Sequence, residues 1–135
     1  MLATTDTTEW AGDPRIAMDD LDHIFERLAR SPFRSRFQLR AKEQEYLKSK
    51  GLDVILDHGR DFIQKRLAPA EPENDGRQTP MGKHPIFVAQ HATASCCRGC
   101  LEKWHAIPKG RPLSPEENAY VIRVLGRWLR AQLGE

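Results

Sequence analysis

The chain has 135 residues, of which 39% are hydrophobic and 30% are charged, and its formal net charge is only +2. This length supports one domain with its own hydrophobic core, and the composition is that of a globular protein. No apolar run approaches the roughly 20 residues that cross a bilayer, and the near-neutral charge neither requires nor excludes a nucleic-acid partner. We expect a mainly α domain of four or five helices, with at most one short strand or small hairpin.

The N-terminal region is polar and rich in threonine, and Gly12 and Pro14 interrupt any regular pattern. We therefore expect residues 1–17 to form a flexible tail and residues 18–135 to form a single helical domain. The tail lacks the basic start and the apolar stretch of a secretory signal, which favours a cytoplasmic location.

Helical periodicity marks three segments in the first half of the chain and one at its C-terminus. A cap at Asp19 or Asp20 predicts a first helix that ends near Ala29, before Ser31-Pro32. The C-terminal helix is the best specified, because Ser114-Pro115-Glu116-Glu117 is a capping box with proline at the first helical position. The two remaining expected helices are residues 41–50, which end at Gly51, and residues 53–67.

A long connection separates the third helix from the cysteine-rich segment. Residues 69–85 contain four prolines and two glycines, and Asn74-Asp75-Gly76 is a strong turn signal. Because long connections in compact domains are commonly functional, we expect this one to form a wall of the site. The apolar run Ile86–Ala89 that follows has a β-branched bias and is predicted to be a short strand.

Reactive side chains concentrate in residues 84–105, which hold all three cysteines and three of the five histidines. Ser95 is a good N-cap, so we expect a helix that starts at Cys96. At about 100° per residue, the sulfurs of Cys96, Cys97 and Cys100 would then share one helical face.

A zinc site is the first chemistry that suits this face. Zinc prefers four tetrahedral nitrogen or sulfur ligands, and Cys97-x2-Cys100 is a usual half-site, which Cys96 can extend. His91 precedes the cap and is the preferred fourth ligand, whereas His105 points away from the sulfurs unless the helix ends near Leu101. His84 is a further alternative, although an exposed role in the loop is expected for it.

Two other readings of the cysteines stay open. A thiol enzyme would use Cys97 or Cys96 as the nucleophile or redox group, with His91 as the base and with the helix N-terminus and Arg98 lowering the thiol pKa. Alternatively, the cysteines are inert and pack against Trp104 in an accessory protein that binds a partner without a metal.

A basic stretch precedes the second helix. Residues 27–50 contain eight basic and two acidic residues, with Phe33 and Phe37 interleaved. Such a patch could neutralise the phosphates of a nucleic acid or contact an acidic protein, or it is a solvated face whose arginine stems cover the two aromatic rings. The candidates for nucleic-acid contact are Arg30, Arg34, Arg36, Arg40 and Lys42.

Several runs of the sequence resemble a bacterial and phage family catalogued as domain of unknown function 4186. The resemblance covers about residues 20–129, and the runs that carry it are RLAPA at 66–70, NDG at 74–76, QTPM at 78–81, HPIFVAQHAT at 84–93 and CCRGCLEKWH at 96–105. It implies a single domain and a genuine cysteine and histidine cluster, but no activity. Ser95 stands where family members have threonine, which preserves a capping hydroxyl.

Overall fold

The computed structural model describes residues 14–135, with side chains from residue 21 onward, and this part of the chain contains helices and no strand. None of its helices has both the length and the apolar character that a membrane span requires. The helices are α1 (Pro14–Ala29), α2 (Pro32–Ser35), α3 (Ala41–Lys50), α4 (Leu52–Arg66), α5 (Pro85–Ala92), α6 (Arg98–His105) and α7 (Pro115–Gln132).

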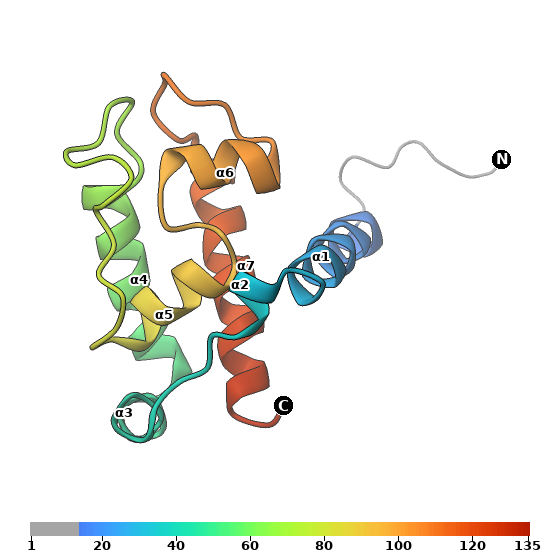
Figure 1. Cartoon of the computed structure of the whole chain (residues 1–135), viewed down its shortest axis with the longest axis vertical. Coiled ribbons are helices and arrows are strands. Elements are labelled where there is room, and N and C mark those ends of the chain that lie inside the picture. Colours follow the sequence, from blue (N-terminus) through green and yellow to red (C-terminus); the bar gives the residue numbers. More distant parts are fainter. Residues whose placement is uncertain (1–13) are drawn as a thin grey trace, which may run out of the picture.

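The centre of the fold is a pair of long helices, α4 and α7, with α5 packed against both (Figure 1). The short α3 joins α4 through Gly51, whose φ of 89° lies in the region that favours glycine. Close contact between α4 and α5 depends on Gly59, since a Cβ there would lie 2.7 Å from Ile86 Cδ1. The central layer is therefore packed too tightly for a larger residue at this crossing.

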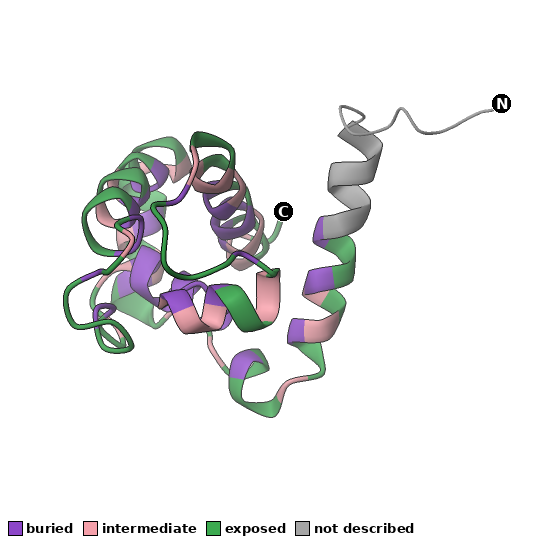
Figure 2. Ribbon diagram, turned by 90° about the horizontal axis from the view of Figure 1, so that it is seen from above, coloured by how far each residue is buried: buried purple, intermediate pink, exposed green. Residues whose placement is uncertain are grey.

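The hydrophobic core divides into two clusters. The larger one is contributed mainly by α4, α5 and α7, and Ile55, Ile86 and Leu125 are fully buried within it. The smaller one joins α1 to α7 through residues that include Ile24 and Val124. Figure 2 shows that the buried residues of α1 lie along the side that faces the other helices. Burial of this stripe is what docks α1 on the body of the protein.

The predicted strand at Ile86–Ala89 is wrong, because these residues lie inside α5. His84 is the N-cap of this helix: its Nδ1 accepts a hydrogen bond from the backbone N–H of Ile86 at 3.0 Å, and Pro85 occupies the first helical position. Every residue from Pro85 to Ala92 is buried. A helix that is buried on all sides has no polar stripe, so its sequence shows an apolar run and no helical period.

The described residues form seven helices where four or five were expected. Ser31 and Pro32 end α1, as predicted, but they also start α2, because the Ser31 hydroxyl accepts a hydrogen bond from the backbone N–H of Arg34 at 3.1 Å. α1 begins at Pro14, earlier than the predicted caps. Most of the predicted tail, residues 1–13, lies outside the described residues.

Three further predicted helices are confirmed. The helix predicted at 41–50 is α3, and the one predicted at 53–67 is α4, one residue earlier at each end. The capping box at the start of α7 is present, with the Ser114 hydroxyl accepting from the Glu117 N–H at 3.1 Å and the Glu117 carboxylate accepting from the Ser114 N–H at 2.9 Å.

A buried arginine holds together the loops around the start of α6. Arg98 is 1% exposed, and its two terminal nitrogens donate to five backbone carbonyl oxygens at distances of 2.8–3.4 Å. Because a guanidinium presents its N–H groups in a fixed plane, this one side chain can fasten the end of α4 and the loop before α7 to α6. The five carbonyls belong to Leu67, Ala68, Pro69, Pro108 and Arg111.

Replacing Arg98 by lysine should lower the free energy of unfolding by about 2–4 kcal/mol, because a single ammonium cannot reach all five carbonyls and leaves some of them buried without a donor. Urea unfolding followed by circular dichroism measures this loss. Arg77 is an exposed arginine in the long connection, so Arg77→Lys is the matched control and should change stability by less than about 0.5 kcal/mol. Equal stability of the two variants would contradict the role given to Arg98.

Candidate metal centre

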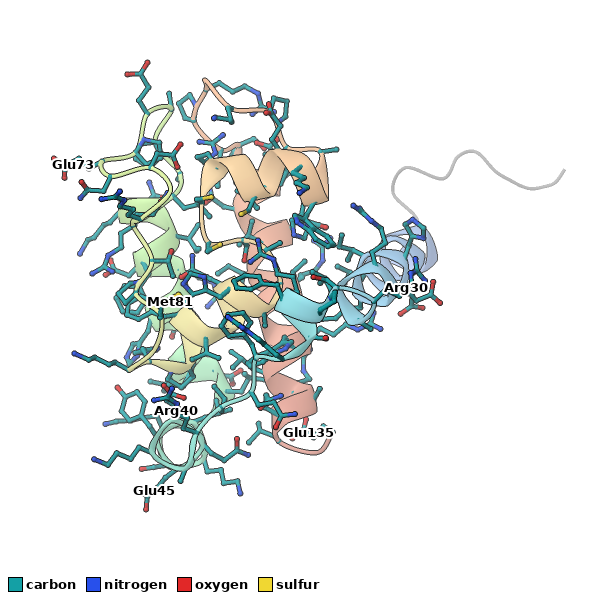
Figure 3. The ribbon with its side chains drawn as sticks, in the orientation of Figure 1. Arg30, Arg40, Glu45, Glu73, Met81 and Glu135 are labelled. Carbon is teal, nitrogen blue, oxygen red and sulfur yellow. The ribbon has the colours of Figure 1, made fainter. Side chains whose placement is uncertain are left out.

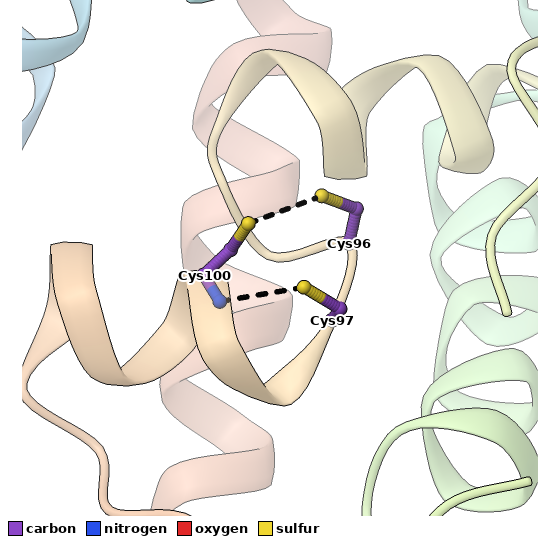
Figure 4. Close-up of side chains that lie close together, drawn as sticks. All are labelled: Cys96, Cys97 and Cys100. Carbon is purple, nitrogen blue, oxygen red and sulfur yellow. Dashed lines mark hydrogen bonds between the residues drawn. The ribbon is translucent and has the colours of Figure 1, made fainter. Parts of the chain in front are cut away.

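The three cysteines converge in space. Cys96 and Cys97 lie in the connection between α5 and α6, and Cys100 lies in the first turn of α6 (Figure 4). Their sulfur atoms all lie within 4.8 Å of one another, and the Sγ atoms of Cys96 and Cys100 are 3.7 Å apart. This group, called the cysteine trio below, is the only set of three or more histidine, cysteine or acidic residues with metal-binding spacing in the described part of the chain.

The trio is formed by a tight turn and not by one continuous helix. The predicted helix start at Cys96 is wrong: α6 begins at Arg98, and the Cys97 sulfur caps it by accepting from the Cys100 N–H at 3.4 Å. Ser95, the predicted cap, instead closes the turn after α5 through two bonds with Gln90, from the Ser95 N–H to the Gln90 carbonyl at 2.8 Å and from Gln90 Nε2 to the Ser95 carbonyl at 3.0 Å. The turn therefore brings Cys96 beside Cys100 from outside the helix.

The long connection forms a wall of this turn. The Thr79 hydroxyl, which is buried, donates to the Cys96 carbonyl oxygen at 2.8 Å. Asp75 Oδ1 accepts from the Arg98 N–H at 3.2 Å and from Gln78 Nε2 at 3.0 Å. These bonds hold the backbone at Cys96 and at Arg98, within the trio's turn, so the spacing of the sulfurs does not depend on the cysteines alone.

The spacing of the sulfurs fits a tetrahedral metal. Two thiolates bound to one zinc ion at about 2.3 Å in tetrahedral geometry are about 3.8 Å apart. The observed 3.7 Å between the Cys96 and Cys100 sulfurs matches this value. Three sulfur donors are also the ligands that soft and borderline metal ions prefer. The trio could therefore supply three of the ligands of a tetrahedral metal ion.

A buried arginine adjoins the trio. The Arg34 side chain comes from α2, and the residue is 9% exposed. Its Nη2 lies 3.2 Å from the Cys100 sulfur, and its Nη1 lies 3.7 Å from the Cys96 sulfur and 2.7 Å from the His91 carbonyl oxygen. The expected cation beside the thiols, Arg98, instead points its guanidinium at backbone carbonyls. Arg34 thus takes the electrostatic role that the sequence assigned to Arg98.

Arg34 has no carboxylate partner among the described residues. Apart from the sulfurs and one carbonyl, the guanidinium contacts aromatic rings, with its central carbon 4.9 Å from the centre of the Phe33 ring and 5.9 Å from that of Trp104. A buried cation is costly unless negative charge compensates it. Within the part of the chain whose side chains are described, the groups in contact with Arg34 that can become negative are the thiols of Cys96 and Cys100.

In the absence of a metal, the three thiols favour their protonated forms. The hydrogen bond with Cys100 lowers the pKa of Cys96, but its bond with Cys97 and its burial outweigh this effect and raise the pKa above its ordinary value. For Cys97 the bond with Cys100, and for Cys100 the bond with Cys96, is the main cause that raises the pKa, and burial adds to it. A bound metal cation would reverse this preference, because it replaces the protons.

His91, the predicted fourth ligand, lies outside the trio's group of ligand atoms. Its Nε2 is 3.1 Å from the carbonyl oxygens of both Thr79 and Pro80. Carbonyls only accept, so Nε2 carries the proton. The ring is buried, which lowers its pKa, and it stacks on Phe37 with 5.8 Å between the ring centres. In this arrangement His91 anchors the long connection, and its backbone carbonyl receives Arg34.

The structure also leaves His105 and His84 outside this group of ligand atoms. His105 uses both ring nitrogens, with Nε2 donating to the Thr93 carbonyl at 2.8 Å and Nδ1 lying 2.7 Å from the Tyr120 hydroxyl. His84 Nε2 lies 3.1 Å from His58 Nδ1. Because His84 Nδ1 accepts from the backbone at the start of α5, its Nε2 is the protonated nitrogen and donates to His58.

The predicted basic patch is divided by the fold. Arg34 is buried beside the trio, and Arg30 directly follows α1, away from Arg40 at the start of α3 (Figure 3). Arg36, Arg40 and Lys42 are exposed and lie along the connection from α2 into α3. The structure therefore brings together only the later part of the patch.

The sequence model of the family described as Domain of unknown function (DUF4186) matches residues 22–130. The match includes the whole cysteine trio, Arg34 and all five histidines. No solved structure matches the chain. The family description assigns no activity, so a function has to be argued from the geometry of the trio and its surroundings.

His84 should make stability depend on pH. Burial, followed by the charge of His58, lowers its pKa from 6.5 to about 4. Between these values the unfolded chain binds more protons than the folded one, so stability is retained above pH 6.5 and is lost as pH falls toward 4, by at most about 3 kcal/mol. His84→Asn keeps an acceptor for the Ile86 N–H but does not titrate, so its unfolding free energy should fall less over this range.

The measurement is the free energy of unfolding in urea at several pH values between neutrality and the folded-state pKa. His23 is exposed on α1, so the His23→Asn variant is the control and should keep the pH dependence of the unmodified protein. If His84→Asn keeps that dependence as well, His84 is not its source.

Proposed function

This chain belongs to the family of domain of unknown function 4186, and we propose that it is a zinc-binding module in which Cys96, Cys97 and Cys100 hold the metal as thiolates. The observation that carries the proposal is the convergence of the three sulfurs within 4.8 Å of one another, with 3.7 Å between the Cys96 and Cys100 sulfurs, a spacing that suits a tetrahedral ion. Arg34 supports it, because three thiolates on a divalent cation leave a net negative charge beside this buried guanidinium.

The donor set favours zinc over other common metals. Calcium and magnesium take oxygen ligands, and iron–sulfur clusters use four cysteines as a rule. Zinc accepts three thiolates readily, and its charge and tetrahedral preference suit a compact turn. Hydrogen bonds from Arg34 to two of the sulfurs would orient these ligands and moderate their charge.

The fourth metal position would not come from the trio. His91 and His105 have their protonated nitrogens committed to carbonyl oxygens, and neither lies within the group of ligand atoms. In zinc sites with three protein ligands, the fourth position is open to water or to an exogenous ligand, and zinc makes a bound water more acidic. The positive charge of Arg34 beside two of the sulfurs would favour an anionic ligand at such a metal.

Untagged protein should contain about one zinc ion per chain, as measured by mass spectrometry under non-denaturing conditions, and Cys97→Ser should lose most of it. The variant is informative because Cys97 also caps α6, and serine is a preferred N-cap. A loss of metal with unchanged helical content therefore reports on the thiolate and not on the helix.

Ser95→Ala is the control, since it alters the same turn without removing a sulfur. It should keep its zinc. Purified protein that contains no zinc and takes up none when the ion is added would overturn the proposal, as would a Cys97→Ser variant that binds zinc as tightly as the unmodified protein.

A second candidate function is thiol chemistry, with Cys96 or Cys97 as the reactive group. The observation that favours it is the 3.7 Å between the Cys96 and Cys100 sulfurs, close enough for a disulfide to form with little movement. This step removes two electrons and two protons from the pair and passes them to an oxidant such as glutathione disulfide. His91, the base expected from the sequence, is less suited to the role because its Nε2 is used by two carbonyls and neither of its ring nitrogens lies within the group of ligand atoms that the sulfurs form.

Reaction with Ellman's reagent separates the two candidates. A zinc module should show three thiols that react slowly until a chelator removes the metal, whereas a thiol enzyme should show one thiol that reacts faster than free cysteine at neutral pH. Zinc-free protein with three slow thiols would contradict both and would leave an accessory protein with inert cysteines.

A further inference from the structure

A cationic cleft lies on the surface formed by the start of α3, the connection from α2 and the segment before α5. Two adjoining hollows, of about 540 and 500 Å³, share Arg40, Glu43 and Lys83 in their walls. Figure 3 shows two of the lining residues, Arg40 and Met81, on these neighbouring segments. The cleft is separate from the cysteine trio, none of whose members lines it.

Basic residues dominate the walls of this cleft. Arg36, Arg40, Lys42 and Lys83 line it, all four are exposed, and none takes part in an ion pair within the described residues. The only acidic residue in the walls is Glu43. Four cations against one carboxylate give a local positive charge that the net charge of +2 for the chain conceals.

Glu43 serves as a brace between the two walls. Its side chain is buried, with one oxygen accepting from the Arg40 N–H at 2.8 Å and the other from the Lys83 N–H at 2.9 Å. These bonds tie the start of α3 to the segment before α5. The Glu43 carboxylate binds only the backbone N–H groups of Arg40 and Lys83, so it fixes the backbone of both residues. Their charged side chains remain available to a ligand.

Apolar side chains, two of them aromatic, lie beside the cations. The Arg36 guanidinium lies over the Phe33 ring at 4.7 Å and near the Phe37 ring at 5.5 Å. Phe37 and Met81 line the cleft, and Phe33 and Met81 are among the most exposed large hydrophobic residues described, at 43% and 59%. Phe33 lies outside the walls of the two hollows but contacts Phe37 at the edge of the cleft, with 5.3 Å between the ring centres, and an exposed ring beside cations is a surface on which unpaired bases stack.

We propose that this cleft binds single-stranded nucleic acid, with its basic side chains at the phosphates and the Phe33, Phe37 and Met81 surface against the bases. An acidic protein segment would use the cations but has no need for the apolar surface. A duplex hides its base faces and would lose the same contacts. The assignment replaces Arg30 and Arg34 of the predicted patch with Lys83, and it does not require a metal in the trio.

The test is fluorescence anisotropy with a labelled oligothymidine of about 12 nucleotides, using the full chain. Binding should appear at low salt, and log Kd should rise with log salt concentration with a slope near 3, since each of four neutralised phosphates contributes about 0.7 for a single strand. No binding at low salt, or binding that is insensitive to salt, would overturn the proposal.

A matched pair of double variants locates the site. Arg40→Gln with Lys83→Asn removes two charges from the cleft and keeps the backbone donors to Glu43, and asparagine suits the positive φ of 81° at Lys83. It should weaken binding about tenfold or more. Arg30→Gln with Lys48→Gln removes the same charge from exposed positions outside the cleft walls and should stay within about twofold. Equal weakening by both pairs would mean that only net charge matters, which would contradict the proposal.

Phe33→Ala tests the stacking surface and the nature of the ligand. It should weaken oligothymidine binding severalfold while leaving the binding of a polyglutamate peptide unchanged. If polyglutamate displaces the oligothymidine at equal charge and Phe33→Ala has no effect, the cleft serves an acidic protein and the nucleic-acid proposal fails. Circular dichroism of each variant confirms that a loss of binding is not a loss of fold.

Discussion

The buried guanidinium of Arg34 is the interaction on which the arrangement of the site depends. It joins α2 to the end of α5, 57 residues away along the chain, through the His91 carbonyl, and to the first turn of α6, 66 residues away, through the Cys100 sulfur. A cation in this position has to be compensated, and one carbonyl dipole compensates it only in part. The Phe33 and Trp104 rings and the two sulfurs supply further compensation, so the placement of α2 is coupled to the ionisation of the cysteine trio. A metal that ionises the thiols would serve both, because the same thiolates would bind the metal and neutralise the arginine.

Arg98 shows how different a buried arginine is when its acceptors are all backbone oxygens. Five backbone carbonyl oxygens accept hydrogen bonds from its terminal nitrogens. Without the arginine, these carbonyls at the loop ends would lose this donor. Such a group needs no thiolate or metal, and its effect is to fix loops. The two residues look alike in the sequence, and Arg98 stands between two of the cysteines. What separates a structural role from a role in the site is therefore the chemistry of the acceptors, which becomes visible only in the folded chain.

The parts of the fold that could be predicted from the sequence are those with local signals. The capping box before α7, the glycine after α3 and the amphipathic stripe of α4 each act within a few residues, and these three helices were placed correctly. The fully buried α5 carries no such stripe, and its one local signal was a proline directly after His84, which is an unusual cap. For the site, the convergence of the trio was predictable because its members are near neighbours in sequence. Arg34 was not, since it reaches the sulfurs across more than 60 residues, and no pattern shows that the ring of His91 is used by backbone carbonyls.

The cysteine trio and the cationic cleft are joined through α2. Arg34 points inward to the sulfurs, whereas Arg36 and Phe37, two and three residues later, line the cleft. Phe37 also stacks on the ring of His91, and the backbone carbonyl of His91 accepts a hydrogen bond from Arg34. The wall of the cleft is therefore linked to the same guanidinium through His91. A helix of four residues offers little length over which a displacement could be absorbed. A change in charge at the sulfurs that displaced Arg34 would therefore act on the His91 carbonyl and, through the His91 ring, on Phe37 in the wall of the cleft.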